Sequence, residues 1–271
     1  MKKISVLLLA GFAAAPCAHA LSKLQERPAD RYEEALQRAA NTDISVPPTV
    51  ELSDKDVSAF SGIGIIACTV DSGIQTATAF LVGAFDIGVT VAHEFEDAHT
   101  GAAATDCFYT SIDSLGQIRE RIPVSYVKSQ WTEAGAARQP GKDVAVFRLS
   151  QPSRYAQKTM PLGKFSGDTA PVIMVGYRAD IGWSTSKRKA SGIAFERSSE
   201  GVARFTHDMD SRGIAPGAPV IDERSGVIIG IHTRLSERNG IITMSDWLES
   251  TLRNEIQQKA AKNDADQDDS G

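Results

Sequence analysis

The sequence predicts an all-β protein with a single C-terminal helix. From Phe60 onward the chain consists of short apolar runs rich in Val, Ile and Thr, separated by turns that contain Gly, Asp and Ser. These runs are GIGIIACTV, TATAFLVG, DIGVTVAH, DVAVFRL, PVIMVGY, SGIAFE, GVARFTHD, APVID, GVIIGIH and GIITM. A clear helical pattern returns only after Met244. Many short strands and few helices are typical of a β-barrel or β-sandwich.

The strand-rich region is expected to form two halves. Its weakest strand signals lie between Gln151 and Phe165. We therefore expect a first β-barrel over residues 59–150 and a second β-barrel over residues 160–244.

The chain after Met244 is predicted to form one helix that packs on the β structure. We expect this helix over residues 245–260, with Ser245 as its N-cap. Its apolar side chains, at helical spacing, are Trp247, Leu248, Leu252 and Ile256. Residues 261–271 are acidic and lack apolar groups, so we expect a disordered tail.

The N-terminal region has the features of an export signal. Residues 1–20 combine two lysines, a short apolar run and an Ala-His-Ala end, which predicts a signal peptide cleaved after Ala20. Its apolar run is too short for a membrane span. The mature chain is therefore expected to be periplasmic or secreted and free of the membrane. Residues 21–58 contain a helical pattern and then a proline-bearing stretch, as in a pro-segment or an N-terminal arm.

Charge and histidine spacing exclude several kinds of partner. The formal net charge is -5, and it becomes -7 when Lys2 and Lys3 leave with the signal peptide. No basic stripe interleaves with aromatic residues, so nucleic acid is not an expected partner. His99 and His207 are interpreted as surface or structural residues. The histidines lack nearby Cys or acidic residues at ligand spacing, so neither a metal nor another cofactor is expected.

Two cysteines, Cys68 and Cys107, remain after removal of the signal peptide. Exported proteins usually meet an oxidising compartment, in which these two thiols can pair. Closing a loop of about 40 residues would stabilise the fold by about 3–4 kcal/mol. Two separate buried thiols are the alternative.

Four segments resemble those of the chymotrypsin/trypsin-like serine peptidases, most closely the bacterial glutamyl-endopeptidase-like branch. They are TATAFLVGAFDIGVTVAHEF, GKDVAVFRL, PVIMVGYRAD and THDMDSRGIAPGAPVIDERSGVIIGIHT. The resemblance covers residues 58–250 and implies two six-stranded antiparallel β-barrels with a C-terminal helix. It also implies that His93 is the general base and that Asp143 is the carboxylate that orients it. Taken singly, these residues can also be a strand-end histidine and a turn aspartate.

The chemistry of the family explains these two residue types. Imidazole can take a hydroxyl proton near neutral pH. A buried carboxylate fixes the imidazole tautomer and stabilises the imidazolium that forms during attack. His93 and Asp143 would together supply both functions.

The sequence departs from the family at the nucleophile. The family signature is Gly-x-Ser-Gly-x-Pro, and Gly217 and Pro219 set the register that puts Pro216 at the serine position. A one-residue insertion would put Ala215 there instead. Neither residue carries a nucleophile, and proline also lacks the backbone N–H that would help to bind an oxyanion. Ile214 replaces the glycine whose N–H forms the rest of that site in the family.

The segment GVIIGIHT resembles the wall of the family's substrate pocket. The resemblance assigns His232, Thr233 and Gly217 to substrate binding. In glutamyl-specific relatives a histidine at this place faces an acidic side chain, and imidazole can hydrogen-bond a carboxylate. A histidine packed within a strand is the alternative.

The predicted function is that of an exported pseudoprotease, which binds a peptide or protein in the cleft between the barrels without cleaving it. The main alternative is an active serine endopeptidase with a displaced nucleophile such as Ser211. A weak hydrolase in which His93 activates water, and an unrelated periplasmic β protein, are the remaining hypotheses.

Overall fold

The computed structural model describes most of the strand-rich region and the C-terminal helix. The described residues are 50–52, 54–97, 99–113, 116–133, 140–164, 169–177, 187–195, 202–205, 214–235, 238–243 and 245–268. The predicted signal peptide, residues 21–49 of the predicted arm, His207 and Ser211 lie outside the described residues.

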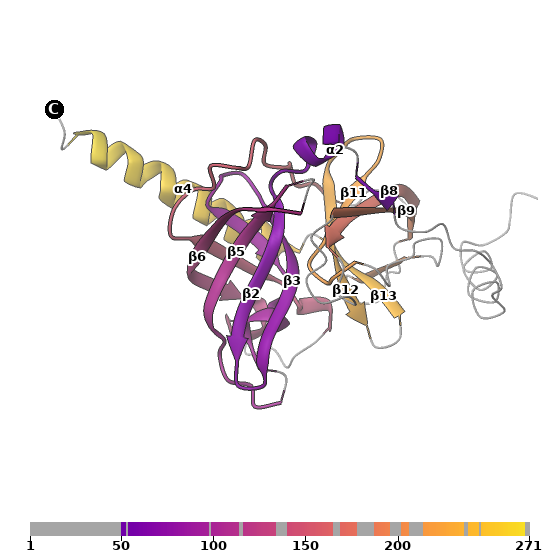
Figure 1. Ribbon diagram of the computed structural model, residues 1–271, viewed down its shortest axis with the longest axis horizontal. Helices are drawn as coiled ribbons and strands as arrows, with labels where there is room; N and C mark the ends of the chain where they lie inside the picture. Colours follow the sequence, from indigo (N-terminus) through magenta and orange to yellow (C-terminus); the bar gives the residue numbers. More distant parts are fainter. Residues whose placement is uncertain are drawn as a thin grey trace, which may run out of the picture.

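The first half of the chain folds into a closed six-stranded barrel (Figure 1). Its strands follow the order β2-β3-β4-β7-β6-β5, and all neighbours are antiparallel. They are β2 (Ile63–Val70), β3 (Gly73–Leu81), β4 (Ile87–Thr90), β5 (Thr105–Ile112), β6 (Ile118–Ser129) and β7 (Ala145–Leu149). The first of the two predicted six-stranded barrels is therefore confirmed.

The interior of this barrel is filled by large side chains that pack tightly. Tyr109 and Phe147 are fully buried, with ring centroids 6.3 Å apart. Gly88 leaves room for the Phe147 ring, because any Cβ at position 88 would collide with it. Such packing makes the barrel wall a rigid support for the residues at its strand ends.

The second half is a seven-stranded sheet in the order β1-β9-β10-β13-β12-β11-β8, with a further pairing between β8 and β9. The strands are β1 (Val50–Glu51), β8 (Thr169–Tyr177), β9 (Lys187–Phe195), β10 (Val202–Phe205), β11 (Pro219–Asp222), β12 (Ile228–Leu235) and β13 (Arg238–Thr243). A separate group of buried apolar residues, including Val172, Met174 and Val220, forms its core.

The second half departs from the predicted closed six-stranded barrel. Strand β1 adds a seventh strand at the edge of β9, and β9 and β10 share only two residue pairs. The sequence did not indicate that Val50–Glu51 would join this sheet, because a two-residue strand has no detectable periodicity.

The C-terminal helix α4 (Asp246–Asp268) begins where the sequence predicts and extends further. Ser245 caps it, since its Oγ accepts the Leu248 N–H at 3.2 Å. The side chains of Leu248 and Leu252 are buried, whereas Ile256 is partly exposed. The helix includes most of the segment 261–271 that was expected to be disordered.

Helix α4 is fixed to the barrel by a charged network centred on Glu255, whose side chain is only 1% exposed. Its carboxylate accepts a hydrogen bond from the Arg148 guanidinium at 2.8 Å and pairs with the Lys128 ammonium at 2.9 Å. The Tyr126 hydroxyl also donates to it.

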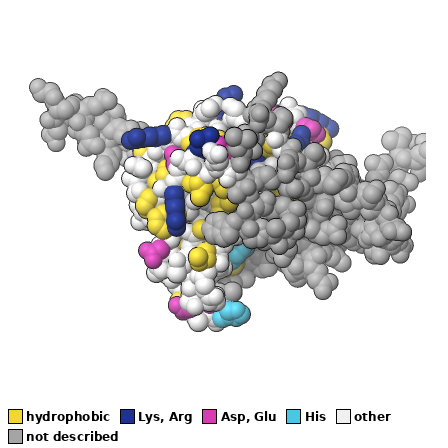
Figure 2. Space-filling model, viewed as in Figure 1, with side chains coloured by type: hydrophobic (Ala, Val, Ile, Leu, Met, Phe, Trp, Pro, Cys, Tyr) yellow, Lys and Arg dark blue, Asp and Glu magenta, His cyan; other side chains and the backbone are white. Residues whose placement is uncertain are grey.

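Figure 2 shows basic, acidic and hydrophobic side chains interspersed on the visible face of the described part of the protein.

Two short helices flank strands of the first barrel, and buried polar contacts join the two halves. Helix α2 (Asp54–Ala59) precedes the first barrel, and α3 (Gln130–Glu133) follows β6. The buried Lys187 ammonium on β9 donates to the Phe60 carbonyl at 2.9 Å. The Tyr177 hydroxyl on β8 donates to the Ile63 carbonyl at 3.4 Å. Within the described part of the chain, no helix is long and apolar enough to cross a membrane.

Candidate active site

The register of two barrel strands brings His93 and Asp143 together. Strands β4 and β7 pair so that Thr90 lies opposite Ala145. His93 follows Thr90 by three residues in the short 3-10 helix η3 (Ala92–Phe95), and Asp143 precedes Ala145 by two. The end of one strand and the start of its antiparallel neighbour therefore meet at the same edge of the barrel.

Asp143 accepts two hydrogen bonds from His93. The His93 backbone N–H donates to Oδ1 at 2.9 Å, and the ring Nδ1 lies 2.7 Å from Oδ2. Because an ionised carboxylate can only accept, Nδ1 carries the proton and a neutral ring has its lone pair on Nε2. The Asp143 side chain is 6% exposed, and that of His93 is 36% exposed. The carboxylate is shielded from solvent, while the imidazole remains accessible.

A third donor to Asp143 comes from the other half of the molecule. The Thr233 hydroxyl on β12 donates to Oδ2 at 2.9 Å, and Thr233 is buried. Sequence reasoning assigned Thr233 to substrate binding and missed this contact. The only available signal was its place next to His232, because no sequence pattern shows that β12 would approach Asp143.

The loop that contains Pro216 is held by backbone hydrogen bonds. Ala215 N–H donates to the Tyr177 carbonyl at 2.7 Å, and Gly217 N–H donates to the His232 carbonyl at 2.8 Å. The Pro216 carbonyl accepts the Thr78 N–H at 2.8 Å. Proline has no N–H of its own. At these three consecutive positions, every available amide hydrogen is therefore already used inside the protein.

Gly217 is required by the geometry of this loop. Its φ is +87°, a conformation that residues with a side chain rarely adopt. A Cβ at this position would collide with the Thr78 carbonyl oxygen and would come within 2.5 Å of the Thr90 hydroxyl. The loop therefore packs directly against β3 and β4, two strands of the barrel that carries His93.

The hydrogen bonds of the described residues leave His93 Nε2 without a partner. Ser211 lies outside those residues, so its place relative to Nε2 stays a prediction. His232 is 2% exposed within β12, which leaves little of its ring accessible to a ligand. The assignment of His232, Thr233 and Gly217 to substrate binding likewise stays a prediction.

A buried acid next to His93 was also missed by sequence reasoning. Glu94 is 1% exposed, and its Oε1 has no hydrogen-bond partner among the described residues. Burial raises the pKa of Glu94 well above its ordinary value. A hydrogen bond from the Cys68 backbone opposes this rise, and the charge of Asp143 adds to it. Burial therefore favours the protonated form of the Glu94 carboxyl, next in sequence to His93.

The predicted disulfide is present. Cys68 on β2 and Cys107 on β5 are bonded, with an S–S distance of 2.07 Å across 39 positions of sequence. The two strands are neighbours in the barrel, and their register shifts between Ala67 and Thr69. The bond fixes this irregular pairing.

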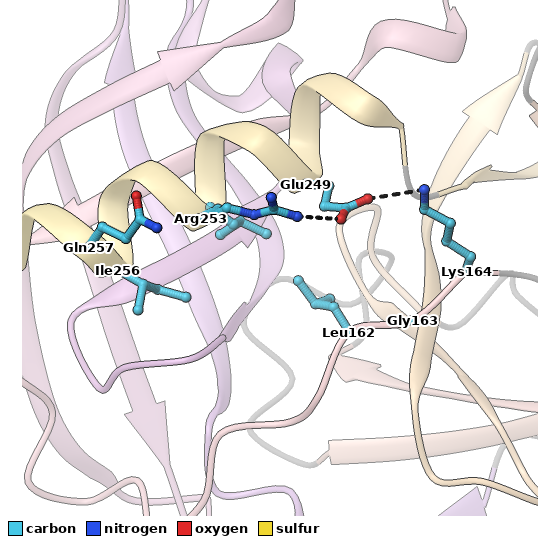
Figure 3. A pocket seen from close by; sticks show the side chains of 8 residues that line it. Leu162, Gly163, Lys164, Glu249, Arg253, Ile256 and Gln257 are labelled. Carbon is cyan, nitrogen blue, oxygen red and sulfur yellow. Dashed lines mark hydrogen bonds and ion pairs between the residues drawn. The ribbon is translucent and has the colours of Figure 1, made fainter.

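A pocket of about 560 Å³ lies away from this site, between α4 and the segment that joins the two halves (Figure 3). Glu249 bridges the Arg253 guanidinium at 2.8 Å and the Lys164 ammonium at 3.1 Å. The lining residues are Leu162, Gly163, Lys164, Glu249, Leu252, Arg253, Ile256 and Gln257. None of them belongs to the predicted catalytic set. The described residues contain no group of three or more side chains suited to hold a metal ion.

Comparison with known proteins identifies the fold. No family model and no curated protein matches the sequence. Among solved structures, a Glu endopeptidase in complex with MPD is similar with a TM-score of 0.61 and 16% identity, over 80% of this chain and 100% of that one. The protease Anisep from Arthrobacter nicotinovorans has a TM-score of 0.59 and 14% identity, over 73% of this chain and 96% of its own.

An inactivated protease paralogue of the scabies mite is similar to the same degree. Its TM-score is 0.58 at 15% identity, over 77% of this chain and 99% of that chain. The same architecture thus occurs in proteases and in an inactivated relative. The chain has the fold of the chymotrypsin/trypsin-like serine proteases.

Proposed function

We propose that this chain is an exported pseudoprotease that binds a peptide or protein where its two halves meet, beside His93, and does not cleave it. The observation that carries the proposal is the Pro216 loop. The residue aligned with the nucleophile has no hydroxyl, and the amide hydrogens of its two neighbours are bonded to Tyr177 and His232. An acyl transfer would therefore lack the attacking oxygen and the N–H of residue 216, one of the two oxyanion donors that the family uses.

His93 and Asp143 are still paired, which supports a protein that has lost its cleavage activity but kept its fold. Asp143 still accepts three hydrogen bonds, from the His93 backbone, the His93 ring and Thr233. Loss of a nucleophile costs about a million-fold in turnover. Loss of an oxyanion donor costs about a hundred- to a thousand-fold, although such losses do not simply add. Little peptide-bond cleavage is expected to survive.

Binding is the function that such a site can keep. A partly exposed imidazole and the surrounding backbone can still contact an extended peptide after the nucleophile is lost. The export assignment rests on the features of residues 1–20. A preference for acidic side chains belongs to the same proposal, and it requires a ligand to reach the His232 ring, which is 2% exposed in the free protein. Comparing the binding of glutamate-rich and lysine-rich peptides tests this preference.

The binding proposal is tested with fluorescein-labelled casein as the probe. Anisotropy should show saturable binding, and the casein should remain intact on a gel. His93→Trp places a bulky ring in the site and should weaken binding at least about tenfold through steric overlap. Arg253→Trp is the matched control, because Arg253 lies on α4 and lines the separate pocket. This variant should bind casein as the unmodified protein does. Cleaved casein, or equal binding by both variants, would contradict the proposal.

The alternative, an active serine endopeptidase that uses Ser211, makes a different prediction. A fluorophosphonate probe would then label the unmodified protein, and Ser211→Ala would abolish the labelling. The proposed pseudoprotease should show no labelling in either form.

A further inference from the structure

We infer that His93 itself is a nucleophile toward activated acyl groups, so that the protein hydrolyses aryl esters and thioesters although it does not cleave peptide bonds. The inference goes beyond the proposed binding function and does not require a bound peptide. It rests on the hydrogen bonds of the imidazole, its accessibility and the composition of the adjacent loop.

The first step of the argument is the tautomer. Asp143 Oδ2 lies 2.7 Å from Nδ1, and the same carboxylate is fixed by the His93 backbone N–H and by Thr233. This arrangement holds the proton on Nδ1 and leaves the lone pair on Nε2. A carboxylate on the far nitrogen also fixes the orientation of the imidazole ring.

The second step is access to Nε2. The His93 side chain is 36% exposed, and no described residue hydrogen-bonds to Nε2. In an enzyme with a serine nucleophile, the serine hydroxyl would hydrogen-bond to this nitrogen and transfer its proton to it. Pro216 has no hydroxyl, so the lone pair is available to an acyl carbon from solvent.

The reaction balances without a cofactor. Nε2 attacks the ester carbonyl carbon and forms a C–N bond, while the C–O bond to the aryloxide breaks and its electron pair leaves on oxygen. The resulting acyl-imidazolium is stabilised by the Asp143 carboxylate at Nδ1. Water then adds to the acyl carbon, the C–N bond breaks, and the carboxylic acid departs with neutral His93 restored. The proton that the water gives up is taken by the aryloxide through solvent, which yields the phenol. One ester and one water become one acid and one phenol.

The same loop limits the substrates to activated acyl groups. Ala215 and Gly217 have no free N–H, and Pro216 has none, so these residues do not support an oxyanion. An amine leaving group would also need a proton, whereas aryloxide and thiolate leave as anions. Peptide bonds are therefore excluded and aryl esters and thioesters are accepted.

The test uses p-nitrophenyl acetate and four proteins. His93→Gln should lower the hydrolysis rate at least about tenfold relative to the unmodified protein. His99→Gln is the matched control, because His99 is exposed and its ring has no carboxylate partner among the described residues; its rate should be unchanged. Asp143→Asn should reduce the rate as His93→Gln does, since an asparagine amide donates to Nδ1 and moves the ring proton to Nε2.

Mass spectrometry of acid-quenched protein should find the acetyl group on the peptide that contains His93. A rate for His93→Gln equal to that of the unmodified protein, or a loss of rate in His99→Gln, would overturn the inference. An acetyl group on a serine, together with fluorophosphonate labelling, would instead show that the proposed pseudoprotease is an active serine hydrolase. Casein binding that fails while the His93-dependent rate persists would refute the binding function alone.

Discussion

Lys187 should make the stability of this protein strongly dependent on pH above neutrality. Its side chain is 3% exposed at the junction of the two halves, and its Nζ donates to the Phe60 carbonyl at 2.9 Å. The Lys187 Nζ also lies 5.9 Å from the centroid of the Tyr177 ring. Burial lowers the pKa of Lys187 from 10.5 to about 7. The folded protein therefore releases this proton far more readily than the unfolded chain does.

The sign and size of the effect follow from proton linkage. Between pH 7 and pH 10 the unfolded chain holds the proton and the folded protein does not, so stability rises with pH. One proton difference corresponds to about 1.4 kcal/mol per pH unit. From pH 8 to pH 9.5 the unmodified protein should therefore gain about 2 kcal/mol relative to a variant that lacks the amine.

Lys187→Met is the appropriate variant, because methionine fills a similar space without a charge. Urea unfolding at pH 8 and 9.5 measures the difference in free energy of unfolding between the two proteins. Titratable groups that both proteins share contribute equally, so their effects cancel in this difference. At pH 8 the free energy of unfolding of Lys187→Met should exceed that of the unmodified protein. At pH 9.5 this difference should be smaller by about 2 kcal/mol. Parallel pH profiles would refute the argument that Lys187 is buried uncharged.

Three further changes test other parts of the structure. Glu255→Gln should lower the free energy of unfolding by about 3 kcal/mol or more, because it removes the buried carboxylate that pairs with both Arg148 and Lys128. Glu249→Gln, at a side chain that is 39% exposed, should cost much less. Equal losses in urea unfolding would contradict this account. Alanine at both Cys68 and Cys107 should cost about 3–4 kcal/mol, and a loss below about 1 kcal/mol would show that the disulfide does little. Glu94→Gln should raise the melting temperature at pH 7, and this gain should shrink toward pH 4. The reason is that the raised pKa of Glu94 makes the folded state favour the protonated acid, which glutamine resembles. A gain in melting temperature that stays the same from pH 7 to pH 4 would contradict this prediction.

Local patterns in the sequence were sufficient for much of the fold. The short apolar runs predicted β2, β3, β4 and β7 of the first barrel but missed β5 and β6, whose sequences are more polar. Ser245 correctly marked the start of α4. His93 and Asp143 were paired on the strand motifs around them, and the structure brings them to 2.7 Å. Each of these features depends on contacts within a strand, a cap or a pair of recognisable motifs.

Features that depend on distant contacts were not predictable. Thr233 reaches Asp143 only because β12 of the second sheet lies beside the first barrel, at a separation of 90 residues. Glu94 and Lys187 look like ordinary surface residues in the sequence, and their burial appears only when the two halves and the barrel wall are assembled. The joining of β1 to β9 has the same origin, since two residues carry no pattern of their own.

The central claim is that His93 and Asp143 form an intact base next to a loop that has lost its nucleophile. Fluorophosphonate labelling of the unmodified protein beside a Pro216→Ser, Ile214→Gly double variant tests this claim most directly. We expect no labelling of the unmodified protein and His93-dependent labelling of the double variant, because the variant regains a hydroxyl and the N–H of residue 216, together with the glycine that the family has at position 214. Labelling of the unmodified protein, or none in a correctly folded double variant, would contradict the account.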